Sequence, residues 1–316
     1  MAKKKPLEKR FTRPKGWLTG TFTNARGLGL HYGQFSSHEK PLAHIVFVPG
    51  LSEFTEKSYE LARDFNRNAC NFSVFDRPCQ GRSPRLLKDK FKQHSAGMEQ
   101  DVDDLIDFCK THVPKGEPIV LFGHSTGGLI ALLALQKAPE LFKAGIMSAP
   151  LWSFKNPLIR DKEYMASNVP LPEMAREVYI PGGGPWKPRH KVTNEMRTDA
   201  FSRDPVRNKV HDYWQDKYPV LRTGAPTIGW TQDKCIGIVK ASDKKFLKSI
   251  KRPVLLFTAG EDALVNNDNA LKMIKQIKNA KHVHYNKGRH ELLMETDDIR
   301  SDLLYKQTIP FLKNNL

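Results

Sequence analysis

The chain alternates short apolar runs with longer amphipathic segments from about residue 44 onward. The apolar runs have the length of strands and are hydrophobic at successive positions, which is typical of strands buried on both faces of a parallel sheet. These runs lie at 44–49, 71–76, 118–123, 144–150, 253–259 and 282–285. The segments between them have apolar residues at helical spacing and lie at 56–68, 96–113, 127–139 and 267–279. The alternation predicts an α/β fold with a mostly parallel central sheet and helices on both faces.

One long interval interrupts this alternation. Residues 151–249 lie between two predicted strands and far exceed the roughly 2–6 residues of an ordinary αβ connection. The interval contains four of the five tryptophans, namely Trp152, Trp186, Trp214 and Trp230. Because aromatic residues are scarce in disordered segments, we expect an inserted, mainly helical lid. The core is then discontinuous and comprises residues 1–150 and 250–316.

The composition is that of a globular protein. Of the 316 residues, 39% are hydrophobic and 27% charged, and no apolar run approaches the roughly 20 residues that span a bilayer. The cysteines have neither metal-ligand spacing nor the pattern of a disulfide framework, so we expect no metal site and no disulfides. The basic N-terminus lacks the apolar segment of a secretory signal, which predicts a cytoplasmic protein.

The formal net charge of +17 favours contact with anionic surfaces. Seven basic residues and one acidic residue lie within residues 1–16. This run is expected either to hold the protein peripherally on anionic lipid, at about 1 kcal/mol per basic residue, or to be a solvated tail. Nucleic-acid binding is not expected, because no recognition motif accompanies the basic residues.

The sequence Gly-His-Ser-Thr-Gly at 123–127 joins the predicted strand 118–123 to the predicted helix 127–139. On a tight strand-to-helix turn of this kind a serine hydroxyl is exposed as a nucleophile, and glycines stand where side chains would collide. The start of the helix also stabilises negative charge beside the serine oxygen. Ser125 is therefore the candidate nucleophile.

A serine nucleophile needs a base to take its proton and a carboxylate to orient that base. On an α/β-hydrolase sheet the order along the chain is Ser, acid, His, with the last two on loops after late strands. Asp262 follows the strand 253–259, and His290 follows the strand 282–285. The alternatives are the neighbouring carboxylate Glu261 and three histidines that we expect to pack instead of react: His124, His282 and His284.

Acyl transfer to a serine also needs donors for the negative charge that develops on the carbonyl oxygen. The strand 44–49 ends in a glycine-bearing turn that leads into a helix. The backbone N–H of Leu51 in this turn, paired with the N–H of Thr126 after the nucleophile, would supply two such donors.

These residues resemble the lysophospholipase and monoacylglycerol lipase-like serine hydrolases, in particular the bacterial lysophospholipase branch. The resemblance covers nearly the whole chain and includes the turns around "VPGLSEF", "FDRPCQGRSPR" and "GHSTGG". It is most specific in "SRDPVRNKVHDYWQDKYPVLRTGAPTIGW" and "GRHELLMETDDIRSDLL". The chain departs from the family at Pro49, where His is common, at Pro78-Cys79, and at Thr126, where Met is usual.

The resemblance implies an α/β-hydrolase fold and a catalytic triad of Ser125, Asp262 and His290, with Leu51 and Thr126 as oxyanion donors. It implies a carboxylester substrate with one acyl chain and no metal or organic cofactor. It does not distinguish a lysophospholipid from a monoacylglycerol.

Two questions about the lid stay open at this point. Its aromatic residues are candidates for binding the acyl chain, although packing of the lid against the core explains each of them equally well. These residues are Trp152, Phe154, Tyr213, Trp214 and Trp230. The fold also supports amide or thioester hydrolysis, and an aminopeptidase would need a lid carboxylate, such as Glu173 or Glu177, to hold the substrate amine.

Overall fold

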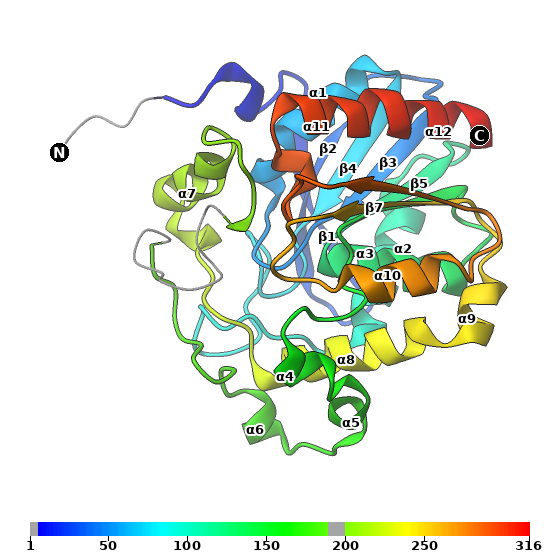
Figure 1. Ribbon diagram of the computed structural model, residues 1–316. Coiled ribbons are helices and arrows are strands. Elements are labelled where there is room, and N and C mark those ends of the chain that lie inside the picture. Colours follow the sequence, from blue (N-terminus) through cyan, green and yellow to red (C-terminus); the bar gives the residue numbers. More distant parts are fainter. Residues whose placement is uncertain (1–5, 189–199) are drawn as a thin grey trace.

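The computed structural model describes residues 6–188 and 200–316 and has one central sheet (Figure 1). Eight strands follow the order β1-β2-β4-β3-β5-β6-β7-β8. Neighbouring strands from β4 to β8 are parallel, whereas β2 pairs antiparallel with both β1 and β4. The strands are β1 (Leu18–Thr23), β2 (Gly29–Phe35), β3 (Ala43–Val48), β4 (Cys70–Phe75), β5 (Ile119–His124), β6 (Ala144–Ser148), β7 (Val254–Ala259) and β8 (Ala280–Tyr285).

The predicted fold class is confirmed, and β3 to β8 coincide with the six predicted strands to within a few residues. The hairpin of β1 and β2 was not predicted. Both strands are partly exposed, and each contains an interior glycine, Gly20 or Gly33, so neither has the continuous apolar run of a buried strand. Gly33 is required by packing, because a Cβ there would collide with the ring of Trp17.

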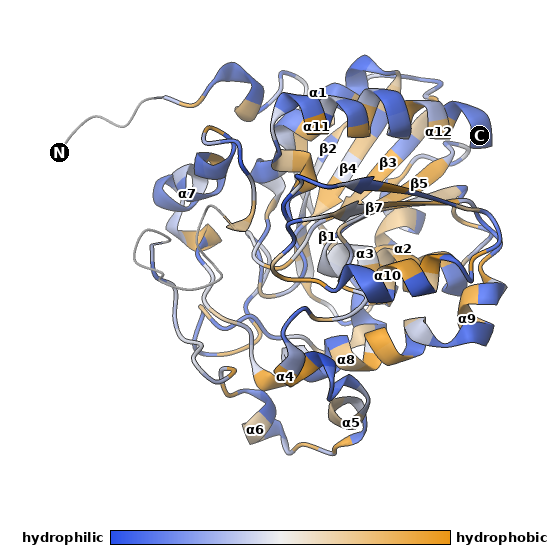
Figure 2. Cartoon of the chain, viewed as in Figure 1, coloured by the Kyte–Doolittle hydropathy of each residue, from blue (hydrophilic) through white to orange (hydrophobic). Residues whose placement is uncertain are grey.

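Helices cover both faces of the sheet (Figure 1). One face is covered by α1 (Tyr59–Arg67), α11 (Asp297–Ser301), a π-helical turn (Asp302–Thr308) and α12 (Ile309–Asn315). The other face is covered by α2 (Met98–His112), α3 (Thr126–Lys137), α8 (Ile228–Ser242), α9 (Lys244–Ser249) and α10 (Asn267–Ile274). The buried strands are hydrophobic, and hydrophilic residues lie on the outward sides of the helices (Figure 2).

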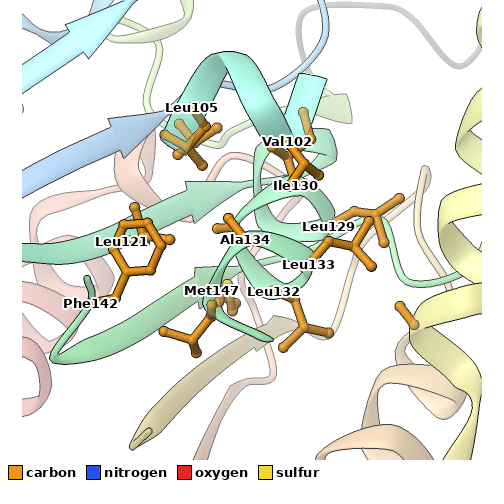
Figure 3. Close-up of a cluster of buried hydrophobic side chains, with 14 of the residues drawn as sticks. Val102, Leu105, Leu121, Leu129, Ile130, Leu132, Leu133, Ala134, Phe142 and Met147 are labelled. Carbon is orange, nitrogen blue, oxygen red and sulfur yellow. The ribbon is translucent and has the colours of Figure 1, made fainter. Parts of the chain in front are cut away.

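Alternate residues of each central strand enter different cores. In β3, for example, Val46 packs on one side of the sheet and Phe47 on the other. Helix α3 is buried from Thr126 to Leu135, because it lies between the sheet, α2 and α8. Its side chains lie among those of Leu121 and Met147 on the strands and of Val102 and Leu105 on α2 (Figure 3). Since fully burying one such aliphatic side chain contributes about 1.5–3 kcal/mol, the start of α3 is held firmly in the core.

The described residues between β6 and β7 form helices and add no strand to the sheet. Besides α8 and α9, the α-helices in the described part of this insertion are α4 (Pro157–Arg160), α5 (Glu163–Asn168), α6 (Glu173–Arg176) and α7 (Asn208–Lys217). Helix α8 packs directly on α3 and α2, whereas α4, α5 and α6 lie beyond it at one end of the molecule (Figure 1).

Two buried cations join the insertion to the core. Arg207, next to the start of α7, donates to both carboxylate oxygens of Glu60 on α1, at 2.9 and 2.8 Å, and to Asp297 at 2.6 Å. Lys234 on α8 pairs with Asp101 on α2. Because the two pairs lie on opposite faces of the sheet, they fix the insertion at both sides.

No helix in the described part of the chain combines the length and apolar character needed to cross a bilayer.

We expect Arg207→Met to lower the free energy of unfolding by about 3–5 kcal/mol, because it leaves the buried Glu60 carboxylate without its main partner. Urea unfolding followed by circular dichroism measures this loss. Arg67→Met is the matched control: Arg67 is 70% exposed and pairs with Asp64 only at 3.4 Å, so it should change stability by less than about 0.5 kcal/mol. Equal effects of the two substitutions would show that Arg207 is not an anchor.

Candidate active site

Ser125 lies on a strained turn between β5 and α3. Its φ of 53° is in the left-handed region, which costs a residue other than glycine about 1–3 kcal/mol. Three backbone hydrogen bonds hold the turn: Ser125 N–H donates to Ser148 O at 3.0 Å, and Ser125 O accepts from Gly128 at 2.9 Å and from Leu151 at 2.8 Å. The surrounding backbone therefore imposes this conformation on the serine.

The glycines on each side of Ser125 are required by close approach of backbone segments. A Cβ on Gly127 would overlap the carbonyl oxygen of Val48 at the end of β3. A Cβ on Gly123 would lie 2.5 Å from the carbonyl oxygen of Gly127. Only glycine at these positions allows the turn to lie against the end of β3.

Asp262 and His290 meet at the loops that follow β7 and β8. Asp262 is 4% exposed, and its Oδ1 accepts hydrogen bonds from the backbone N–H groups of Leu264 at 2.8 Å and Val265 at 3.0 Å. Its Oδ2 lies 2.8 Å from Nδ1 of His290. With Nδ1 donating to the carboxylate, Nε2 of His290 has a free lone pair and can act as a base.

The charges of this pair support each other. Burial alone would raise the pKa of Asp262, but the positive charge of His290 and three hydrogen bonds outweigh it and lower that pKa. Burial alone would lower the pKa of His290, but Asp262, followed by Glu291 and Glu53, outweighs it and raises that pKa above 6.5. The arrangement thus stabilises an imidazolium at His290.

Close contacts link the serine turn to the histidine and to the loop after β3. The ring centroids of His124 and His290 are 4.9 Å apart. A Cβ on Gly50 would lie 3.1 Å from Cβ of Ser125 and 3.2 Å from Cδ2 of His124. The three loops meet at the carboxyl edge of the parallel strands, where open α/β sheets bind their ligands.

The two expected oxyanion donors lie at this edge. Thr126 is the first residue of α3, so its N–H has no partner within the helix. The N–H of Leu51 has no hydrogen-bond acceptor within residues 6–188 and 200–316. Both donors are therefore available to a substrate oxygen.

The alternative acid and histidines have other partners. Glu261 is 43% exposed and pairs with Arg203 and Arg289. His124 is buried, and its Nδ1 lies 3.2 Å from the carbonyl oxygen of Ser148. His282 and His284 contact the Thr258 hydroxyl at 2.7 and 2.8 Å. Of the two neighbouring carboxylates, Asp262 is the one that orients His290.

The candidate acyl-binding residues are mostly engaged in packing. Trp152 is fully buried and donates to Gly128 O at 3.4 Å, and Trp230 is buried in the same core. Trp214 packs edge-on against Tyr59 with a centroid separation of 5.7 Å. Phe154 is half-buried, so it is the one of these four that retains substantial exposed surface.

Comparison with known proteins identifies the family. The profile of the family described as "Serine aminopeptidase, S33" (Hydrolase_4) matches residues 39–297. The chain belongs to this family of serine hydrolases. The family match spans both the serine turn and the loops that carry Asp262 and His290.

The chain is also similar to individual proteins, over most of its own length and most of theirs. Lysophospholipase L2 of Escherichia coli K12 is 28% identical over 279 residues, which cover 83% of this chain and 78% of that protein. "Probable lysophospholipase L2" of Haemophilus influenzae is 26% identical over 302 residues, with coverage of 92% and 90%. A soluble variant of monoglyceride lipase from Saccharomyces cerevisiae has the same fold, with a TM-score of 0.71, 16% identity and coverage of 98% and 97%.

A buried charge network behind the site was not predicted from the sequence. Nζ of Lys57 in this hydrolase lies 2.8 Å from Oε1 of Glu53 and 2.6 Å from Oε1 of Glu291. Oε2 of Glu53 accepts a hydrogen bond from Gly50 N–H at 2.6 Å. Burial alone would raise the pKa of Glu53, but Lys57, then His124, and these hydrogen bonds lower it to about 2.

The network joins the loop after β3 to the residue that follows His290. The spacing of Glu53 and Lys57 gave no signal in the sequence, because Glu53 precedes the helical turn Thr55–Ser58 that carries Lys57. Nothing local links Lys57 to Glu291, because the two are 234 residues apart.

Asp262→Asn should lower kcat by about 10⁴-fold, because the amide no longer favours the productive tautomer of His290. The base must be neutral, so wild-type kcat/KM should fall as pH decreases through the raised pKa of His290, with a midpoint above 6.5. Removing the carboxylate lowers that pKa and moves the midpoint to lower pH. Rate profiles from pH 4.5 to 9 measure both effects.

The matched control is Glu261→Gln, which changes the adjacent exposed carboxylate and should leave the midpoint in place. A shift with Glu261→Gln, or an unshifted profile with Asp262→Asn, would contradict the assignment of Asp262.

Proposed function

We propose that this hydrolase cleaves the ester of a single-acyl lipid, a lysophospholipid or a monoacylglycerol, through an acyl-enzyme on Ser125. The observation that carries the proposal is the buried 2.8 Å contact between Asp262 and His290 beside the strained serine turn. The substrate class is supported by the relatives named lysophospholipase L2 and by one named monoglyceride lipase homolog.

The proposed reaction has two acyl-transfer steps. Ser125 Oγ attacks the ester carbonyl while Nε2 of His290 takes its proton, and the N–H groups of Leu51 and Thr126 bind the oxyanion. The imidazolium, stabilised by Asp262, then protonates the leaving alcohol. Water enters, His290 takes a proton from it, and the fatty acid leaves as Ser125 regains its hydrogen.

We propose that residues 151–249 form the lid over this site and contribute to the acyl-binding surface. Leu151, the first residue of this segment, donates from its N–H to Ser125 O. The next aromatic positions, Trp152 and Phe154, therefore start close to the nucleophile. Trp214 and Trp230 belong to the same proposed surface, although their present contacts are with the core.

Ser125→Ala should reduce hydrolysis of a p-nitrophenyl ester, a lysophospholipid and a monoacylglycerol by at least about 10²-fold, because it removes the nucleophile. A fluorophosphonate should label the wild type and leave the variant unlabelled. The ratio of the two lipid rates then decides the headgroup. Full activity of the variant would disprove the role of Ser125.

Amide hydrolysis is the second candidate, because the family description names an aminopeptidase. An aminopeptidase needs a carboxylate for the substrate amine, and Glu173 is the exposed candidate on α6. Its charge is partly offset by Arg176 Nε at 3.8 Å, which weakens it as an amine ligand. Aminoacyl anilides cleaved faster than the esters would favour this candidate.

We also propose that the hydrolase contacts anionic membranes peripherally. The helices α4 to α6 and their connections expose large apolar side chains, which mark interaction surfaces in soluble proteins. We call these residues the apolar lid face: Leu158, Tyr164, Met165, Val169, Met174 and Val178. In the N-terminal run, Arg10 pairs with Glu8 at 2.8 Å, so part of its charge is neutralised locally. Lys3, Lys4 and Lys5 lie outside the described residues.

Vesicle binding should separate the two contributions. Leu158→Glu with Met174→Glu should weaken co-sedimentation with phosphatidylglycerol vesicles at both low and high salt, because apolar contact is not screened. Changing Lys3, Lys4 and Lys5 to Gln should weaken it at low salt only, by about 1 kcal/mol per residue.

The matched charge control changes three exposed lysines: Lys115, Lys143 and Lys251. They precede β5, β6 and β7, so they lie at the amino edge of the parallel strands, away from the carboxyl edge that carries the site. This control should bind vesicles like the wild type. If both triple-lysine variants lost vesicle binding equally, net charge alone would explain the binding. That outcome would contradict a specific membrane-facing surface.

A further inference from the structure

Two buried side chains of the turn that follows β4, those of Arg77 and Gln80, donate hydrogen bonds to the loop that follows β3. Arg77 Nη2 donates to the carbonyl oxygens of Pro49 at 3.1 Å and Gly50 at 3.2 Å. Gln80 Nε2 donates to the carbonyl oxygens of Gly50 at 2.9 Å and Glu53 at 3.1 Å. The Gly50 carbonyl therefore accepts hydrogen bonds from both side chains.

The carbonyl of Gly50 and the N–H of Leu51 belong to one peptide unit. This peptide is trans and planar, so its C=O and N–H point in opposite directions. Two donors on the oxygen fix the orientation of the whole plane. They thereby aim the Leu51 N–H away from Arg77 and Gln80. The adjoining Gly50 lies beside the serine turn, since a Cβ on it would be 3.1 Å from Cβ of Ser125.

The two donors also polarise this peptide. Arg77 is 3% exposed, and a guanidinium keeps its charge in proteins. A cation that binds the carbonyl oxygen withdraws electron density from the peptide and strengthens its N–H as a donor, and low local dielectric increases the effect. A neutral glutamine contributes orientation with little polarisation.

The turn that carries the two side chains is itself rigid. Its Asp76 carboxylate accepts from the N–H and hydroxyl of Thr55, both at 2.8 Å, and from Arg82 N–H at 2.8 Å. Nη2 of Arg77 lies 3.1 Å from Oε1 of Gln80, so the two side chains also orient each other. The donors are fixed before any substrate arrives.

We propose that Arg77 and Gln80 are positioning residues for the oxyanion hole, which act by orienting and polarising the Gly50–Leu51 peptide. Neither side chain touches the substrate. The effect appears where charge develops on the carbonyl oxygen, so it acts on the transition state and leaves ground-state binding unchanged. This inference rests on the proposed ester hydrolysis at Ser125.

The test compares Arg77→Met, Arg77→Lys and Gln80→Met on a p-nitrophenyl ester and on an alkyl boronic acid, which forms a tetrahedral anion on a serine. Arg77→Met should lower kcat by 10- to 100-fold with KM within threefold, and should weaken boronic acid inhibition by the same factor. Arg77→Lys should recover at least half of that loss on a logarithmic scale. Gln80→Met should have a smaller effect in the same direction.

Arg82→Met is the matched control, since Arg82 lies in the same turn but pairs with Glu56 at 2.7 Å and stacks on Tyr218. It should keep kcat within twofold. Fluorophosphonate titration gives the concentration of folded sites in each variant, and kcat is calculated per folded site. Misfolded protein therefore does not lower the apparent kcat. If Arg77→Met does not fold, the kcat and inhibition changes of Arg77→Lys and Gln80→Met decide alone.

The inference is wrong if kcat of folded Arg77 and Gln80 variants stays within twofold, if only KM changes, or if Arg82→Met loses as much as Arg77→Met. A wild type that cleaves no ester and resists fluorophosphonate contradicts the proposed function, and the inference with it. An active wild type with unaffected Arg77 and Gln80 variants contradicts the inference only.

Discussion

The site depends on one close backbone contact, between Gly127 at the start of α3 and the carbonyl of Val48 at the end of β3. Because no side chain fits between them, the serine turn lies directly against the loop that carries Leu51. The burial of α3 supplies the packing energy that maintains this contact and the unfavourable φ of Ser125. Backbone strain at the proposed nucleophile is thus supported by the hydrophobic core.

Around this contact the site is built from buried charge. Asp262, Glu53, Lys57, Arg77 and Glu291 are all largely withdrawn from water, and each has a charged or hydrogen-bonded partner in the structure. Isolated buried charges would be very costly, but in a low-dielectric environment paired ones interact strongly. The same groups therefore hold the loops in place and set the electrostatic field in which the proposed acyl transfer takes place.

The insertion between β6 and β7 combines fixed and exposed parts. Arg207 and Lys234 tie α7 and α8 to opposite faces of the core through buried carboxylates. The short helices α4 to α6 present the apolar lid face to solvent, and the part-buried ion pair of α6, Arg176 with Asp233, joins it to α8 of the same insertion. This division suits the membrane contact that we propose, in which the anchored helices keep the site formed while the apolar lid face meets lipid.

The sequence alone determined β3 to β8, the serine turn and the order of Ser125, Asp262 and His290, because continuous apolar runs and tight turns leave local signals. The tertiary structure decided features that depend on distant partners. The β1–β2 hairpin is a partly exposed edge without a strong apolar pattern. Lys57 meets Glu291 across 234 residues, and Arg77 reaches Gly50 across 27. A long side chain's partner is set by where the chain folds back, which no local pattern encodes.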